Sequence, residues 1–169
     1  VAAFVETLDI PVVLDPVCVS KAGSNLLEDD ALSSLRELSR IATLTTPNLH
    51  EAYRLFGYLS GESDSLDALI AHPSPVLIKN HIVSSLSADL LYFGRSKRIF
   101  TDDLIPSTDL HGTGCSYASA IAASLALGDS LEESIVHAKR FITEAIRRAP
   151  HIGHGPGPIN HKAGAPHAS

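Results

Sequence analysis

The stretch His111-Gly-Thr-Gly-Cys-Ser-Tyr-Ala-Ser-Ala-Ile-Ala-Ala-Ser-Leu-Ala-Leu127 indicates the fold class of this 169-residue sequence. Two glycines flank Thr113, and the small and apolar residues after them predict a helix that begins at Gly112 and ends at Gly128. Such glycines let the backbone approach a ligand, and the helix start offers unpaired N–H groups. The pattern indicates a phosphate site, but simple close packing of small residues explains it equally well.

Helices and short apolar strands alternate along the rest of the chain. Apolar runs predict strands at residues 11–15, 41–44 and 75–79, and a hairpin at 88–93 and 97–101. Helical spacing predicts helices at residues 28–38, 48–56, 63–71 and from Ser130 onward. On the 28–38 helix, one face should contain Leu27, Ala31, Leu35 and Leu38. The alternation predicts an α/β layered domain with a mainly parallel sheet over residues 1–150, followed by an irregular Gly/Pro/His-rich tail at 151–169.

Composition excludes several classes of protein. The formal net charge of −6 argues against a nucleic-acid or anionic-membrane surface, and no apolar run has the length of a membrane span. The two cysteines, Cys18 and Cys115, are far apart and form no CxxC pair. A disulfide framework or zinc ribbon is therefore not expected, and a reducing, cytoplasmic location is.

Two polar motifs follow predicted strands. Asp15 ends the first apolar run, where α/β folds bind ligands, although an acid in an ordinary turn has the same pattern. Asn48 and Glu51 follow the second run at the N-x-x-E spacing of a helix capping box. The same two side chains could hold magnesium and phosphate through water. Spacing alone favours the capping interpretation.

Five segments resemble, in the same order, the motifs of the hydroxymethylpyrimidine/phosphomethylpyrimidine kinases. They are VVLDPVCVSKAG (12–23), LTTPNLHEA (44–52), VLIKNH (76–81), HGTGCSYASAIAASLALGDSLEESIVHAK (111–139) and HIGHGPGPINH (151–161). The resemblance implies a ribokinase-like three-layer sandwich. It also implies ATP- and Mg²⁺-dependent phosphorylation of hydroxymethylpyrimidine and its monophosphate, in thiamine biosynthesis. Cys115, where most pyridoxal kinases carry Asp, points to the pyrimidine branch.

The resemblance also implies roles for the loop residues. Gly112, Thr113 and Gly114 correspond to the anion hole that stabilises the transferring phosphoryl group, with the two glycines also touching the nucleotide. Cys115 corresponds to the catalytic residue that faces the substrate hydroxyl, and a thiol in the first turn of a helix has a lowered pKa. Val17 corresponds to a backbone position near the pyrimidine.

Four further residues have implied roles in nucleotide and metal binding. Asp15 and Glu51 correspond to the acids of the magnesium–phosphate region, Glu51 acting through water. Asn48 is the polar partner in that motif, and Lys79 corresponds to a strand lysine that neutralises phosphate charge. A lysine that merely extends from a strand end to solvent is the alternative for Lys79.

The sequence departs from the family pattern at several places. Asn80 replaces glycines in the third motif, so the local nucleotide loop should differ, and Cys18 replaces a methionine and should be a small buried hydrophobe. Family members carry a long segment before the first motif, with the first strands and most of the pyrimidine pocket. We therefore expect this chain to correspond to the C-terminal part, to turn over little pyrimidine alone, and to self-associate through an exposed sheet edge.

Two alternatives to the pyrimidine kinase remain open at this point. One is a pyridoxal kinase of the same fold, and the other is an inactive fragment or partner module. Both the pyrimidine kinase and the pyridoxal kinase would act on a small-molecule substrate. The tail histidines are interpreted as ordinary tail residues, because no ligand spacing unites His151, His154, His161 and His167.

Overall fold

The computed structural model describes residues 1–18, 27–152 and 155–164. The second half of the first motif (19–23), His154 and His167 lie outside these residues. The chain forms two compact units, which are described separately: residues 1–81 and 88–99 form the first, and residues 82–87 and the chain from Phe100 onward form the second. In the part of the chain that is described, no helix has the length and hydropathy that crossing a membrane requires.

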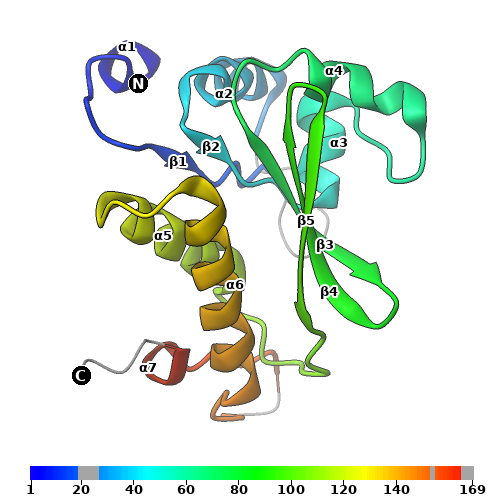
Figure 1. Ribbon diagram of the computed structural model, residues 1–169, viewed down its shortest axis with the longest axis vertical. Helices are drawn as coiled ribbons and strands as arrows, with labels where there is room; N and C mark the ends of the chain where they lie inside the picture. Colours follow the sequence, from blue (N-terminus) through cyan, green and yellow to red (C-terminus); the bar gives the residue numbers. More distant parts are fainter. Residues whose placement is uncertain (19–26, 153–154, 165–169) are drawn as a thin grey trace. The chain divides into compact units, whose positions relative to one another are not determined.

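Five strands form one sheet in the order β1-β2-β3-β4-β5 (Figure 1). The strands are Val13–Leu14 (β1), Leu44–Thr45 (β2), Val76–Val83 (β3), Leu86–Phe93 (β4) and Ser96–Asp103 (β5). The first three run parallel, with Val13 opposite Leu44 and Thr45 opposite Val76. Parallel strands place their carboxyl ends at the same edge of the sheet, which positions the residues after β1 and β2 close to β3.

The third strand is longer than its sequence predicts. The expected strand ended at Lys79, but β3 continues to Val83 and turns into β4 through Ser84 and Ser85, with φ angles of 48° and 71°. Two successive positive φ values match the twist of a tight hairpin, a conformation usually marked by Asn-Gly. The serine pair gave no such signal. Gly94, with φ 55°, makes the second turn, so the predicted β4–β5 hairpin is confirmed.

Helices connect these strands and follow them. They are Ala2–Val5 (α1), Asp29–Ile41 (α2), Leu49–Phe56 (α3), the 3₁₀ turn Ser63–Leu66 (η1), Asp67–Ile70 (α4), Thr113–Ala126 (α5), Leu131–Arg147 (α6) and His161–Gly164 (α7). Gly57 ends α3 with φ 69°, and a Ser130–Glu133 capping box begins α6. The predicted inner face of α2 was wrong in part, because Ala31 is exposed and Leu32 is buried instead.

Each unit has its own apolar packing. In the first, strands and α3 share a core that contains Ala52, Tyr58, Leu69, Val76, Ile78, Leu90 and Tyr92. In the second, α5 and α6 pack against each other and α7 packs on α6. Ile121, Ile135 and Ala138 are almost completely buried there. Tyr117 and Ile121 are four residues apart on α5, and Ile135, Ala138 and Ala145 recur at helical spacing on α6, so the buried residues of each helix share one face.

Residues 155–164 of the tail are more regular than its Gly/Pro/His-rich composition suggests. Ile159 is buried, Asn160 donates its backbone N–H to the Ala145 carbonyl, and α7 follows directly. A stretch rich in Gly and Pro lacks helical or strand periodicity, so its order comes from contacts that the sequence pattern does not reveal. Residues 155–164 are therefore part of the second unit.

Candidate functional site

A buried ion pair lies at the carboxyl edge of the parallel strands in the first unit. Asp15 directly follows β1, and its Oδ1 lies 2.8 Å from Nζ of Lys79, the fourth residue of β3. The Thr46 hydroxyl, just after β2, donates to the same Oδ1 at 3.3 Å. Side-chain exposure is 7% for Lys79 and 16% for Asp15, so the two charges compensate each other largely away from water.

The capping interpretation of Asn48 and Glu51 is confirmed. The Glu51 backbone N–H donates to Asn48 Oδ1 at 3.0 Å, and the Asn48 N–H donates to Glu51 Oε2 at 2.8 Å. Glu51 is 3% exposed, and burial raises the pKa of its carboxyl above the ordinary value, against the lowering effects of the Asn48 N–H and of Lys79. The Asp15 charge raises the pKa of Glu51 further, so the Glu51 carboxyl interacts electrostatically with both members of the Asp15–Lys79 pair.

Lys79 is not a lysine that extends to solvent. Its side chain is buried, and its backbone N–H donates to the Pro47 carbonyl at 2.9 Å, which fixes β3 beside the loop after β2. The structure therefore brings together four residues that the sequence assigned to metal or nucleotide: Asp15, Asn48, Glu51 and Lys79. What the sequence did not predict is that two of them pair with each other.

Val17 and Cys18 have different environments although they are adjacent. Val17 is 47% exposed, and its backbone N–H donates to the Asp15 carbonyl. Cys18 is fully buried in an apolar cluster with Leu32 and Leu55. Burial, followed by the charge of Glu51, raises the pKa of the Cys18 thiol, so it is a small buried hydrophobe as expected.

The glycine loop lies in the second unit and is described there by itself. Gly112 is the N-cap of α5 and has φ 86°, a conformation that favours glycine. The Thr113 hydroxyl donates to the Leu110 carbonyl at 3.0 Å, which closes the turn before the helix. Gly114 is half-buried, and Cys115 is exposed as the third residue of α5. The Thr113 backbone N–H donates to the Leu110 carbonyl at 3.4 Å, so this N–H already has a partner within the turn. The anion site at the start of α5 stays a prediction.

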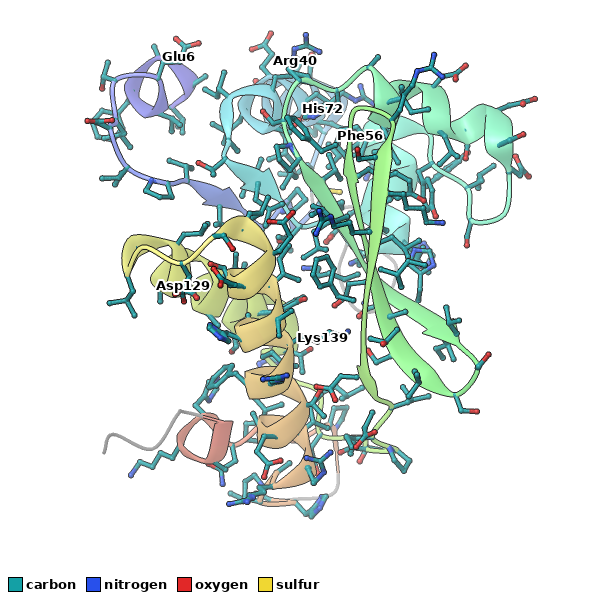
Figure 2. The ribbon with its side chains drawn as sticks, in the orientation of Figure 1. Glu6, Arg40, Phe56, His72, Asp129 and Lys139 are labelled. Carbon is teal, nitrogen blue, oxygen red and sulfur yellow. The ribbon has the colours of Figure 1, made fainter. Side chains whose placement is uncertain are left out.

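Sequence reasoning missed two buried charged residues of the second unit. Asp109, 3% exposed, accepts the Gly157 N–H at 2.8 Å. Lys139 lies on α6 (Figure 2) and is 6% exposed. Its Nζ donates to the Ser87 hydroxyl at 3.3 Å. Neither residue has a spacing that marks it, because both acquire their partners through the fold.

The donor set restricts how magnesium could be held. Among the described residues no group of three or more His, Cys, Asp and Glu could hold a metal ion. In the same part of the chain, the hydrogen bonds of the Asp15 carboxylate all go to Oδ1, which leaves Oδ2 as an acceptor. One or two carboxylates fit Mg²⁺, which usually completes its coordination with water and substrate phosphate.

Comparison with known proteins identifies the family of the chain. The sequence model described as phosphomethylpyrimidine kinase matches residues 1–160. A thiamine biosynthesis bifunctional protein of Geobacter sulfurreducens is 44% identical over 89% of this chain and 32% of its own length. A hydroxymethylpyrimidine/phosphomethylpyrimidine kinase of Mycobacterium bovis is 43% identical over 90% of this chain and 58% of its own.

A solved structure supports the same relationship. The pyridoxal kinase from Staphylococcus aureus in complex with AMP-PCP superposes with a TM-score of 0.78 and 32% identity, over 89% of this chain and 58% of that one. The expected ribokinase-like α/β fold is thereby confirmed. This chain thus spans less than two thirds of the relatives it matches. With its family motifs in order and its fold shared, the chain belongs to the phosphomethylpyrimidine kinase family.

Proposed function

We propose that this chain carries the nucleotide and phosphoryl-transfer residues of an ATP-dependent kinase that phosphorylates hydroxymethylpyrimidine and its monophosphate. The observation that carries the proposal is the Asp15–Lys79 pair beside the Asn48–Glu51 cap, at the edge of the sheet where α/β folds bind ligands. A cation, a carboxylate and a helix start lie together there. That combination suits a magnesium-bound polyphosphate.

Lys79 has two roles in this proposal. It neutralises Asp15 until a nucleotide binds, and it then donates to the nucleotide phosphates. The exchange is favourable because a phosphate offers the ammonium group a new anionic acceptor while Asp15 becomes available to a cation. Asp15 would hold Mg²⁺ through its oxygens and Glu51 through water. When bound, Mg²⁺ neutralises charge on the phosphate oxygens.

The glycine loop supplies the other part of the proposed chemistry. The N–H groups of Gly112 to Cys115 donate to the oxygens of the transferring phosphoryl group, where charge is spread in the transition state. Cys115, as the thiolate, accepts the proton of the substrate hydroxyl while the hydroxyl oxygen bonds to the γ-phosphorus and the bond to ADP breaks. Its exposure in the first turn of α5 gives a substrate hydroxyl access to the sulfur.

Pyridoxal is the alternative substrate, favoured by the structural similarity to the S. aureus pyridoxal kinase. That enzyme and this chain share 32% identity, lower than the 43% shared with the mycobacterial pyrimidine kinase. The two substrates both present a hydroxymethyl group on a heteroaromatic ring. The phosphoryl-transfer chemistry is the same for both, so only substrate recognition distinguishes the two functions.

The test measures ADP release by the purified protein with ATP and Mg²⁺, and compares hydroxymethylpyrimidine with pyridoxal as acceptor. Calorimetric titration with AMP-PCP and Mg²⁺ runs in parallel, because it reports nucleotide binding without turnover. Preference for the pyrimidine supports the proposal, and preference for pyridoxal selects the alternative. Absence of AMP-PCP binding by a folded protein would contradict both.

A further inference from the structure

Residues 157–161, the C-terminal segment, are bonded to both ends of the glycine loop. Before the loop, His111 donates its N–H to the Gly157 carbonyl at 3.1 Å and pairs with Pro158 in an isolated parallel bridge. After the loop, the Ser116 hydroxyl lies 2.8 Å from Nε2 of His161. Residues 112–115 are therefore enclosed between two contacts with one short segment, which lies beside α6 (Figure 1).

The Asp109 carboxylate packs so closely against Gly157 that no side chain fits at position 157. Asp109 Oδ1 accepts the buried Gly157 N–H at 2.8 Å, and Oδ2 pairs with Nδ1 of His151. A Cβ atom added to Gly157 would lie 2.2 Å from Asp109 Oδ1 and 3.0 Å from its Cγ. Real Cβ atoms do not approach so closely, so a side chain here must displace the carboxylate or the segment.

The same carboxylate fixes the chain that leads into the loop. Asp109 precedes Gly112 by three residues, and its own N–H donates to the Ser107 hydroxyl at 3.0 Å. Its side chain is 4% exposed, so its hydrogen bonds form with little competition from water. Displacing Asp109 would therefore change the start of α5 through only a few bonds of backbone.

We propose that Asp109 is a positioning residue, which sets the geometry of the 112–115 loop by holding the C-terminal segment against both ends of it. The inference rests on the proposed phosphate-binding role of that loop. Asp109 does not contact substrate in this scheme. It acts through the backbone of His111 and through the orientation of the loop N–H groups, on which transition-state stabilisation depends.

The experiment compares Gly157→Ala with Gly155→Ala, a matched control two residues before this segment, whose added Cβ meets no atom of the described residues within 4 Å. In Gly157→Ala, hydrogen exchange of the amides of residues 112–116 should become faster, while that of the central α6 amides should not change. The kcat should fall roughly 10- to 100-fold, with KM for Mg²⁺-ATP changed less than about 3-fold. Gly155→Ala should match the wild type in all three measurements.

A double-mutant cycle isolates the Asp109 contact. In the Asp109→Ala background the obstructing carboxylate is gone, so Gly157→Ala should add less than about a 2-fold further loss of kcat. Asp109→Asn keeps an oxygen acceptor for the Gly157 N–H and should retain more activity than Asp109→Ala. It also serves as the test variant if Gly157→Ala does not fold.

The possible results separate this inference from the proposed function. Faster exchange in the loop with unchanged kcat would overturn the positioning role, and so would equal losses from Asp109→Asn and Asp109→Ala. If the folded wild type does not bind AMP-PCP with Mg²⁺, the proposed function fails. The exchange comparison would still decide the inference in that case: unchanged protection of residues 112–116 in Gly157→Ala overturns it, and selective loss supports it.

Discussion

At the scale of single residues, the pairing of Lys79 with Asp15 has opposite consequences for two ligands. A nucleotide phosphate gains a cation when Lys79 moves to it, whereas a divalent cation must compete with Lys79 for Asp15. One substitution should therefore weaken binding of the nucleotide and strengthen binding of the metal. If Lys79 only bound phosphate, the same substitution would weaken nucleotide binding and leave metal binding unchanged.

We predict this divergence for Lys79→Met, which keeps much of the side-chain volume and removes the charge. Affinity for AMP-PCP should fall about 10-fold or more, because a hydrogen bond to a charged group is lost. Affinity for Mn²⁺ without nucleotide should rise roughly 3- to 10-fold, because the competing cation is gone. Calorimetry measures both, and Lys162→Met is the exposed control. Weaker Mn²⁺ binding in Lys79→Met would contradict the competition.

Glu51 requires a substitution that separates its cap from its charge. Gln serves the N3 position of a capping box nearly as well as Glu, so Glu51→Gln should preserve α3 and its bond from the Asn48 N–H. We predict that the Mg²⁺ concentration required for half-maximal ADP release rises several-fold, with little change in helix content by circular dichroism. An unchanged Mg²⁺ titration would leave the cap as the full explanation of this residue.

Cys115 is the residue whose loss should affect the chemical step most. We predict that Cys115→Ala lowers kcat about 100-fold or more, because a general base or charge-stabilising contact typically contributes that much. AMP-PCP affinity should change little, since the loop N–H groups remain. Steady-state kinetics and calorimetry test the two parts separately. Turnover near that of the wild type would remove Cys115 from the mechanism.

The residues that sequence alone identified share one property. Asp15, Asn48 and Glu51 follow strands or begin a helix, so a local pattern reveals them. The Asp15–Lys79 bond joins residues 64 positions apart, and the Asp109–Gly157 bond joins residues 48 apart. No local period encodes such pairs. The fold therefore had to be known before the partners of Lys79 and Asp109 could be identified.

At the scale of elements, the limits of α3 and the start of α6 were predicted more closely than the end of β3, for a physical reason. Capping boxes mark the first residues of α3 and α6, and a glycine in the left-handed conformation marks the end of α3. Residues close together in the sequence therefore identify these helix ends. The β3–β4 turn uses two serines at positive φ, which any pattern search for Asn-Gly or Gly-Gly overlooks. The parallel strands β1 and β2 are only two residues long, and their pairing depends on distant partners.

His72 connects two elements of the first unit. It follows α4, and its Nε2 lies 3.1 Å from the Ser39 hydroxyl of α2, while its Nδ1 lies 2.9 Å from the Ser74 carbonyl. Its ring meets Phe56 edge-on, with centroids 5.1 Å apart (Figure 2). Burial lowers the pKa of His72 below its ordinary value of 6.5, and the Arg40 charge lowers it further.

We predict that His72 makes the protein less stable in acid. A lowered pKa in the folded state means that the unfolded state binds the proton more tightly, so the contribution is complete above about pH 6.5 and is lost as the pH falls. Between pH 7.5 and 5.5 the melting temperature of the wild type should fall more than that of His72→Gln. The raised pKa of Glu51 acts in the opposite direction, but it is common to both proteins. Equal slopes would contradict the prediction, and His50→Gln, at an exposed position, is the control.

At the scale of the whole molecule, stability and ligand binding are linked. A ligand that binds only the folded protein stabilises it by about 2.7 kcal/mol at a concentration 100-fold above its Kd. For a chain of this size, each kcal/mol raises the melting temperature by about 2–4 °C. Because the chain forms two compact units, thermal unfolding can occur in one transition or two, and the transition that responds identifies the unit that holds the nucleotide.

We therefore predict that Mg²⁺ and AMP-PCP, at 100-fold the Kd, raise the melting temperature of the wild type by roughly 5–11 °C. Calorimetry should show this shift in the transition that contains the first unit, since Asp15 and Lys79 belong to it. Asp15→Asn removes the charge that would hold the metal, so most of the shift should disappear at the same ligand concentration. Asp9→Asn, an exposed change in the same unit, should retain it. An equal shift in both variants would mean that the nucleotide binds without Asp15, and the carboxyl edge of the sheet would then not be its site.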